Sequence, residues 1–97
     1  MEIKYWLCQP EQILVVNVPE EFAEKVSYIS LILMSAYDKW IFPEENCESE
    51  DEVEAVYEAD CAPFLIDELY KETGLKLEWA LIDDADAGDA DYYVEAM

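Results

Sequence analysis

The sequence feature that most constrains the fold is a long apolar stripe within residues 17–40. Its large side chains recur at steps of three and four residues, the spacing of one helical face: Phe22, Val26, Ile29, Leu33, Tyr37 and Trp40. Pro19 suits the first turn of a helix, and Glu20 and Glu21 complement the positive end of its dipole. We therefore expect one long, well-buried helix.

Two strand-like segments precede this stripe. Residues 2–8 alternate, with Ile3, Tyr5 and Leu7 on one face. Residues 12–18 are apolar on both faces and rich in β-branched side chains, as in a more central strand. A proline-containing turn at residues 9–12 separates the two segments and predicts an antiparallel hairpin.

Two shorter helices are expected after an acidic, proline-containing loop at residues 42–52. Ser49 followed by Glu52 matches a capping box and predicts a helix with Val53, Val56 and Tyr57 on its apolar side. A further helix is predicted over residues 62–74, where glycine ends it. Its core-facing side chains would be Phe64, Leu65, Leu69 and Tyr70.

The end of the chain returns to strand-like alternation. Residues 75–83 place Leu75, Leu77, Trp79 and Leu81 on one face, and residues 92–96 predict a last short strand pairing back onto them. The order β-β-α-α-α-β-β predicts an α+β fold with a small antiparallel β-sheet, one long buried helix and short acidic helices. Without a linker or an internal repeat, residues 1–97 are expected to form a single compact domain.

The charge of the chain is extreme. Its 97 residues include 25 Asp and Glu against 5 Lys, with no Arg and no His, for a net charge of −20. Hydrophobic residues make up 54% and aromatic residues 13%, too many for the disordered class. Like charges crowded on a folded domain destabilise it, so we expect function to retain them. Without a basic patch, direct binding to nucleic acid or anionic lipid is not expected, and the implied partner is a positively charged surface.

The residue inventory argues against several kinds of site. The absence of His removes the commonest general base and the Ser-His and Cys-His nucleophile pairs, so we expect no enzyme. Gly74 and Gly88 are the only glycines, too few for a phosphate-binding loop motif. Cys8, Cys47 and Cys61 form neither a zinc-binding pattern nor an even disulfide set, which favours reduced cysteines and no cofactor.

The acidic stretch around Gly88 superficially resembles a calcium-binding loop. Gly88 at position 6 of an EF-hand would put Asp83 at position 1. The same register puts Ala85, Ala87 and Val94 at positions 3, 5 and 12, where ligands are needed. We therefore expect no dedicated metal site.

Neither a signal peptide nor a membrane span is expected. The first residues, MEIKYWLCQ, lack the basic start and apolar stretch of a secretory signal. The apolar run at residues 28–34 is far shorter than the roughly 20 residues that cross a bilayer. We expect a cytoplasmic protein that does not bind membranes.

Two acidic clusters are candidate partner-binding surfaces. In an extended chain, Asp84 with Asp86, and Asp89 with Asp91, would lie about 6.6 Å apart on one side. Helical i, i+4 acids lie about 5 to 6 Å apart, and a DNA strand carries one charge per roughly 3.4 Å. The first candidates to imitate phosphates are Asp83, Asp84, Asp86, Asp89 and Asp91; the second surface is Glu50, Asp51, Glu54 and Glu58.

In size, charge and lack of Arg and His, the chain resembles small acidic proteins that mimic nucleic acid, including phage anti-CRISPR proteins and phage inhibitors of restriction enzymes. The resemblance covers overall composition and the clusters at residues 44–60 and 83–91, without a motif match. It implies a non-enzymatic inhibitor that docks on the positively charged DNA- or RNA-binding surface of a host defence complex such as a CRISPR effector. An acidic immunity protein or antitoxin that neutralises a basic nuclease toxin would use the same electrostatics, and a single acidic cluster can also be a solvated face.

Overall fold

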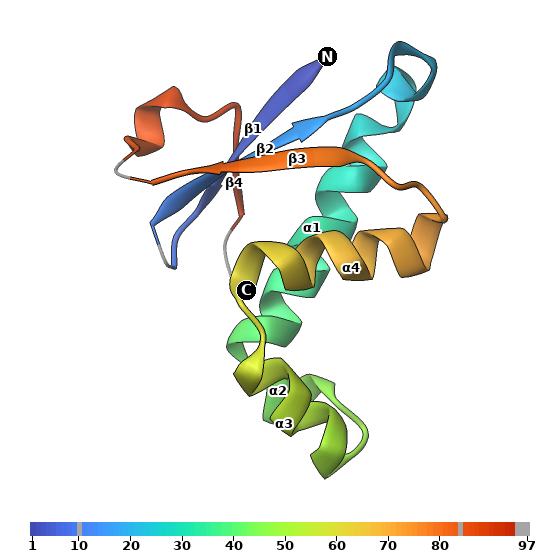
Figure 1. The fold of residues 1–97 in the computed structure, drawn as a ribbon, viewed down its shortest axis with the longest axis vertical. Coiled ribbons are helices and arrows are strands. Elements are labelled where there is room, and N and C mark those ends of the chain that lie inside the picture. Colours follow the sequence, from blue (N-terminus) through green and yellow to red (C-terminus); the bar gives the residue numbers. More distant parts are fainter. Residues whose placement is uncertain (10, 84, 95–97) are drawn as a thin grey trace.

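The computed structural model describes residues 1–9, 11–83 and 85–94 and has an α+β fold, as the sequence predicts. Within these residues, helices cover one face of a four-stranded sheet (Figure 1). The elements in chain order are β1 (Glu2–Leu7), β2 (Gln12–Asn17), the 3₁₀ turn η1 (Glu20–Lys25), α1 (Val26–Ile41), α2 (Pro43–Asn46), α3 (Glu50–Glu58), α4 (Cys61–Thr73), β3 (Glu78–Ile82), the 3₁₀ turn η2 (Ala87–Asp89) and β4 (Tyr92–Val94).

The strand order in the sheet is β3-β2-β1-β4. The predicted antiparallel hairpin of β1 and β2 is confirmed, with Tyr5 opposite Leu14. Ile3, Tyr5 and Leu7 are buried together on the helix-covered face, as their alternation predicts. This face of the hairpin supplies the sheet side of the core.

The prediction that the last strand pairs onto residues 75–83 is wrong, and the sheet is mixed rather than wholly antiparallel. β4 lies at the opposite edge from β3 and pairs parallel with β1. Tyr92 stacks on Tyr5 with 5.6 Å between ring centroids, and Val94 is buried opposite Leu7. The pairing with β1 places Val94, which is 1% exposed, in the hydrophobic core.

Because β3 and β4 lie at opposite edges, the chain between them must cross the sheet. Residues 85–91, which we call the crossing segment, lie over the face opposite the helices, and Figure 1 shows η2 in orange-red on that side. Asp86 and Asp89 line a small cavity there with Lys4 and Ile13 of the hairpin. Ile13 is 1% exposed although it faces away from the helices, since this cover shields it.

The predicted long helix is present, but its start is a 3₁₀ turn, η1, and regular α-helix begins at Val26. The apolar stripe packs inward at Ile29, Leu33 and Tyr37, which confirms a buried helix. The Tyr5 hydroxyl shares a 2.9 Å hydrogen bond with Ser30 Oγ, which ties α1 to the sheet. In the described part of the chain, no helix is both long and apolar enough to cross a bilayer.

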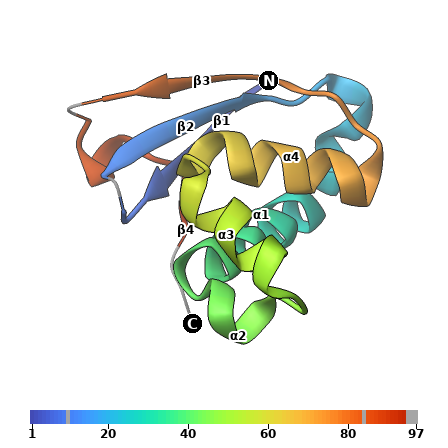
Figure 2. The same ribbon diagram turned by 60° about the horizontal axis from the view of Figure 1, so that its bottom comes forward.

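Helix α4 packs along α1, and Figure 2 shows both below the sheet. Leu65 and Leu69 are buried as predicted, and the helix ends at Gly74, whose left-handed φ of 72° suits glycine. Tyr70 is 50% exposed, so its predicted core position is wrong. Tyr70 follows Leu69 directly, and the rotation from one helical residue to the next directs its side chain away from α1.

Two side chains on the predicted apolar faces of their elements, Tyr57 and Trp79, are exposed. Tyr57 is 63% exposed, because α3 meets the rest of the protein mainly through Val56, which is 3% exposed. Trp79 is 38% exposed, because β3 is an edge strand with a neighbour on one side alone.

The three cysteines are free and differ in accessibility: Cys8 is exposed, Cys47 is half-buried and Cys61 is buried. Burial raises the pKa of the Cys61 thiol to about 12, so little reactive thiolate forms near neutral pH.

We expect Ellman's reagent to modify Cys8 quickly in the native protein and Cys61 only after unfolding in urea. A Cys8→Ser variant should lose the fast phase and a Cys61→Ser variant should keep it; fast native labelling of Cys61 would contradict the prediction.

Candidate partner-binding surfaces

Helices α2 and α3 form an acidic arm at the end of the molecule away from the sheet (Figure 1). The short helix α2 lies in the segment predicted to be a loop and begins at Pro43, which is buried. Residues 42–60 contain no Lys or Arg, and their acids are Glu44, Glu45, Glu48, Glu50, Asp51, Glu52, Glu54, Glu58 and Asp60. This arm therefore concentrates negative charge on a helical scaffold.

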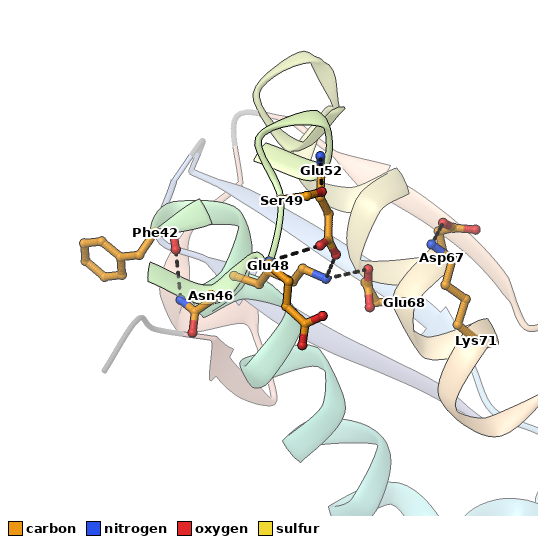
Figure 3. Close-up of polar contacts among 9 residues, drawn as sticks. Phe42, Asn46, Glu48, Ser49, Glu52, Asp67, Glu68 and Lys71 are labelled. Atoms are coloured by element: carbon orange, nitrogen blue, oxygen red, sulfur yellow. Dashed lines mark hydrogen bonds and ion pairs between the residues drawn. The ribbon is translucent and has the colours of Figure 1, made fainter. Parts of the chain in front are cut away.

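The start of α3 is fixed by side-chain caps, shown in Figure 3. The Glu52 backbone N–H donates to Ser49 Oγ at 3.3 Å, as the predicted capping box requires. The Glu52 carboxylate accepts from the backbone N–H of Glu48 at 3.3 Å, one residue before the position that a capping box uses. Both bonds satisfy N–H groups around the first turn of the helix.

Lys39 of α1 holds the arm to the body of the protein. Its Nζ lies 2.9 Å from Glu52 Oε1 and 3.6 Å from Glu68 Oε1, so it links α1 to both α3 and α4. The hydrogen bond with Glu52 raises the pKa of Lys39 and lowers the pKa of Glu52. The Glu52 side chain is thus engaged within the protein.

Four acids of α3 are exposed, and in the described part of the chain their side chains make no hydrogen bond or ion pair. We call them the α3 acids: Glu50, Asp51, Glu54 and Glu58. The structure thus brings the second predicted surface together on one helix. The i, i+4 spacing of Glu50, Glu54 and Glu58 is the spacing that the sequence predicts.

Tyr57, which the sequence pattern predicts on the apolar side of its helix, belongs to the same arm and is exposed. Its hydroxyl donates a 3.0 Å hydrogen bond to Glu44 Oε1 of α2. This hydrogen bond raises the pKa of the Tyr57 phenol. Five acidic residues lie close to it in the sequence, at positions 50, 51, 52, 54 and 58. This density of carboxylates is the sequence feature that indicates solvent exposure of Tyr57. An exposed tyrosine among acids can pack against the aliphatic or guanidinium part of a basic side chain.

The first predicted surface, which comprises aspartates of the crossing segment and those just before it, is arranged differently from the prediction. The expected extended alternation is interrupted by η2 at Ala87–Asp89. Two of its carboxylates accept hydrogen bonds within the protein: Asp83 Oδ1 from Gln12 Nε2 at 2.5 Å, and Asp91 Oδ2 from the Lys4 backbone N–H at 3.0 Å. These two aspartates therefore anchor the ends of the connection between β3 and β4.

Asp86 and Asp89 are the remaining described candidates of this surface, and both are exposed without a side-chain partner in the described residues. Asp84, also a predicted site residue, lies outside the described residues. The crossing segment and the acidic arm lie at opposite ends of the molecule in Figure 1, so they do not form one continuous surface.

The acidic side chains remain spread out rather than gathered into a chelating site. Among residues 1–9, 11–83 and 85–94, no group of three or more His, Cys, Asp or Glu side chains is placed to hold a metal ion. The observed surfaces are therefore rows and pairs of single carboxylates on the outside of the fold. No protein-family model, curated protein or solved structure matches this chain.

Proposed function

We propose that this chain is a non-enzymatic inhibitor that mimics nucleic acid and blocks the positively charged DNA- or RNA-binding surface of a host defence complex. The target class that we favour is a CRISPR effector, in the cytoplasm of a bacterial host cell. The observation that supports this proposal is the set of α3 acids, which are exposed and have no partner in the described residues.

The spacing of the α3 acids suits a site that binds phosphates. From Glu50 to Glu58 a helix rises about 12 Å, at 1.5 Å per residue. A DNA strand presents three to four phosphates over about the same length. Lysine and arginine side chains positioned for these phosphates can reach the helix carboxylates instead, and nucleic acid is then excluded from the site.

The helical order of the arm also favours this use. The cap at Ser49 and the ion pair of Lys39 with Glu52 fix α3 before any partner binds. A surface that is already ordered loses less conformational entropy on binding than a disordered acidic tail does. The carboxylates of α3 are therefore presented at fixed intervals, as phosphates are on a duplex.

A competition experiment tests the proposed function. Purified CRISPR effector complexes are mixed with labelled target DNA and increasing amounts of this protein, and DNA binding is followed by mobility shift. We expect loss of DNA binding, with apparent affinity for the effector falling at least about tenfold between roughly 50 and 200 mM KCl, because salt screens the charges. Effector preloaded with saturating DNA should not bind this protein.

Two results would contradict this mechanism. A stable complex containing effector, DNA and this protein together would mean that the nucleic-acid site is not the one blocked. Binding that is insensitive to salt would mean that charge does not drive it. If no effector is inhibited but a basic nuclease toxin is neutralised, the protein acts as an immunity protein with the same kind of surface.

A further inference from the structure

Strand β3 is an open edge of the sheet. It pairs with β2 on one side, and Figures 1 and 2 show its other side uncovered by the helices. All of its residues, Glu78–Ile82, are exposed. Proteins usually protect such an edge with a lysine, a proline or a bulge, and this strand contains neither lysine nor proline.

The hydrogen bonds at Lys4 establish which backbone groups of β3 point outward. Lys4 donates its N–H to Asp91 Oδ2 and accepts from the Asp91 N–H, so its backbone groups face away from β2. Val15, opposite Lys4, therefore directs its own groups to Ala80 of β3. Along a strand, successive residues direct their backbone N–H and C=O groups to opposite sides. Trp79 and Leu81 therefore point these groups away from β2.

The side chains of this edge are apolar. Trp79 is 38%, Leu81 37% and Ile82 41% exposed. Trp79 and Leu81 face the helix-covered side, opposite Val16 and Leu14 of β2. The edge thus offers unpaired backbone groups together with apolar side chains, which is what an added strand requires.

The charge of the edge favours a second copy of the chain over a basic partner. Residues 75–82 contain one lysine, Lys76, and one acid, Glu78, so they sum to zero in a chain of net charge −20. A cationic surface would be drawn to the acidic arm instead. A neutral strand with an apolar side is better complemented by another neutral strand.

We propose that two copies of this protein pair antiparallel through β3, with Ala80 of one copy opposite Ala80 of the other across a two-fold axis. In this register Trp79 lies opposite Leu81 of the other copy, and each such pair exchanges two backbone hydrogen bonds through the outward groups. Glu78 then lies opposite Ile82, so no carboxylate of the strand lies opposite another.

In this register the nearest acidic groups of the two copies are Glu78 and Asp83, which lie one position apart with their side chains on opposite faces of the sheet. Asp83 lies opposite Leu77 of the other copy, six positions from the second Asp83, which is about 20 Å along the strand. The Debye length is about 8 Å at physiological ionic strength, so the repulsion between the two Asp83 side chains is largely screened, and added salt also weakens the repulsion between Glu78 and Asp83. The dimer should consequently strengthen as salt is added, the opposite of the response expected for effector binding.

Charge-swapped variants at Ala80 test this pairing by sedimentation equilibrium in about 0.5 M NaCl. The wild-type protein is expected to form dimers. Ala80→Glu and Ala80→Lys alone should each raise the dimer dissociation constant about fivefold, because like charges then face each other. An equimolar mixture should restore dimers. Leu81→Pro removes an outward N–H and leaves the β2 ladder intact, so it should abolish dimers.

Ala23→Glu is the matched control, since it adds the same charge at another exposed alanine, in η1, and should dimerise like wild type. A wild-type protein that stays monomeric at high concentration in this salt would overturn the proposal. So would unchanged dimerisation of both Ala80 variants, or a mixture that does not recover. The proposed function fails by a different observation, loss of salt-sensitive effector binding, because Ala80 lies outside the acidic arm.

Discussion

A variant with amides in place of the α3 acids is expected to bind a basic nucleic-acid site about a hundredfold more weakly in about 0.1 M salt. The four changes are Glu50→Gln, Asp51→Asn, Glu54→Gln and Glu58→Gln. An exposed ion pair contributes up to about 1 kcal/mol, so the loss of four at an interface comes to roughly 2.7 kcal/mol, which is the stated factor. Titration of the purified effector, followed by fluorescence anisotropy, measures the change.

The fold of this variant should be retained, since the removed carboxylates make no hydrogen bond or ion pair in the described residues. Glu50 and Asp51 lie in the first turn of α3, where negative charge stabilises the helix dipole by a few tenths of a kcal/mol each. Ser49 and Glu52, which cap the helix, are unchanged. Circular dichroism should therefore show an intact fold with a slightly lower Tm.

A matched variant separates the position of the charge from its amount. Glu2→Gln, Glu20→Gln, Glu21→Gln and Glu24→Gln remove the same charge from exposed acids outside the arm. Long-range attraction then falls equally, but the proposed contact surface is kept, so the affinity should fall no more than severalfold. Equal losses in the two variants would show that net charge, not the α3 surface, determines binding.

In the first predicted surface, fewer aspartates can be replaced without structural change than the sequence suggests. Asp83 and Asp91 hold the connection between β3 and β4, so their replacement would alter the structure as well as the charge. Asp86→Asn with Asp89→Asn removes charge without breaking a described contact. Retained full binding by this double variant would assign the partner contact to the arm.

Local patterns predicted a large part of the fold. Alternation at Ile3, Tyr5 and Leu7 gave the first strand, and the apolar stripe through Leu33 gave the long helix, since both depend on the intrinsic periods of strand and helix. Gly74 ended its helix as predicted, because a left-handed residue is a local requirement. The i, i+4 spacing of the α3 acids follows from helix geometry in the same way.

The errors concern contacts between segments distant in sequence. The alternation near Tyr92 indicates a strand, but the stacking on Tyr5 that selects β1 as its partner joins opposite ends of the chain. In the same way, the aspartate spacing of the crossing segment could not show that Asp91 bonds to the Lys4 backbone. Tyr57 fits an apolar helix face, yet its burial depends on whether another element covers α3 there.

The replacement Leu33→Ala is expected to lower the free energy of unfolding by about 2 to 5 kcal/mol, the usual cost of a cavity at a fully buried leucine. Leu33 is 0% exposed in the core that α1 forms with the sheet and α4. A domain of this size has a stability of about 5 to 15 kcal/mol, and each kcal/mol shifts Tm by about 4 to 8 °C. Tm should therefore fall by at least about 8 °C.

Leu31→Ala is the matched control on the same helix, because Leu31 is 65% exposed and the chemical change is identical. Its effect should stay within about 0.5 kcal/mol, as for other exposed positions. Urea unfolding of both variants must be measured at one salt concentration, since salt screens the self-repulsion of a chain of net charge −20 and so changes its stability. Equal destabilisation by the two replacements would mean that α1 presents a different face to the sheet, because a cavity penalty requires a buried side chain.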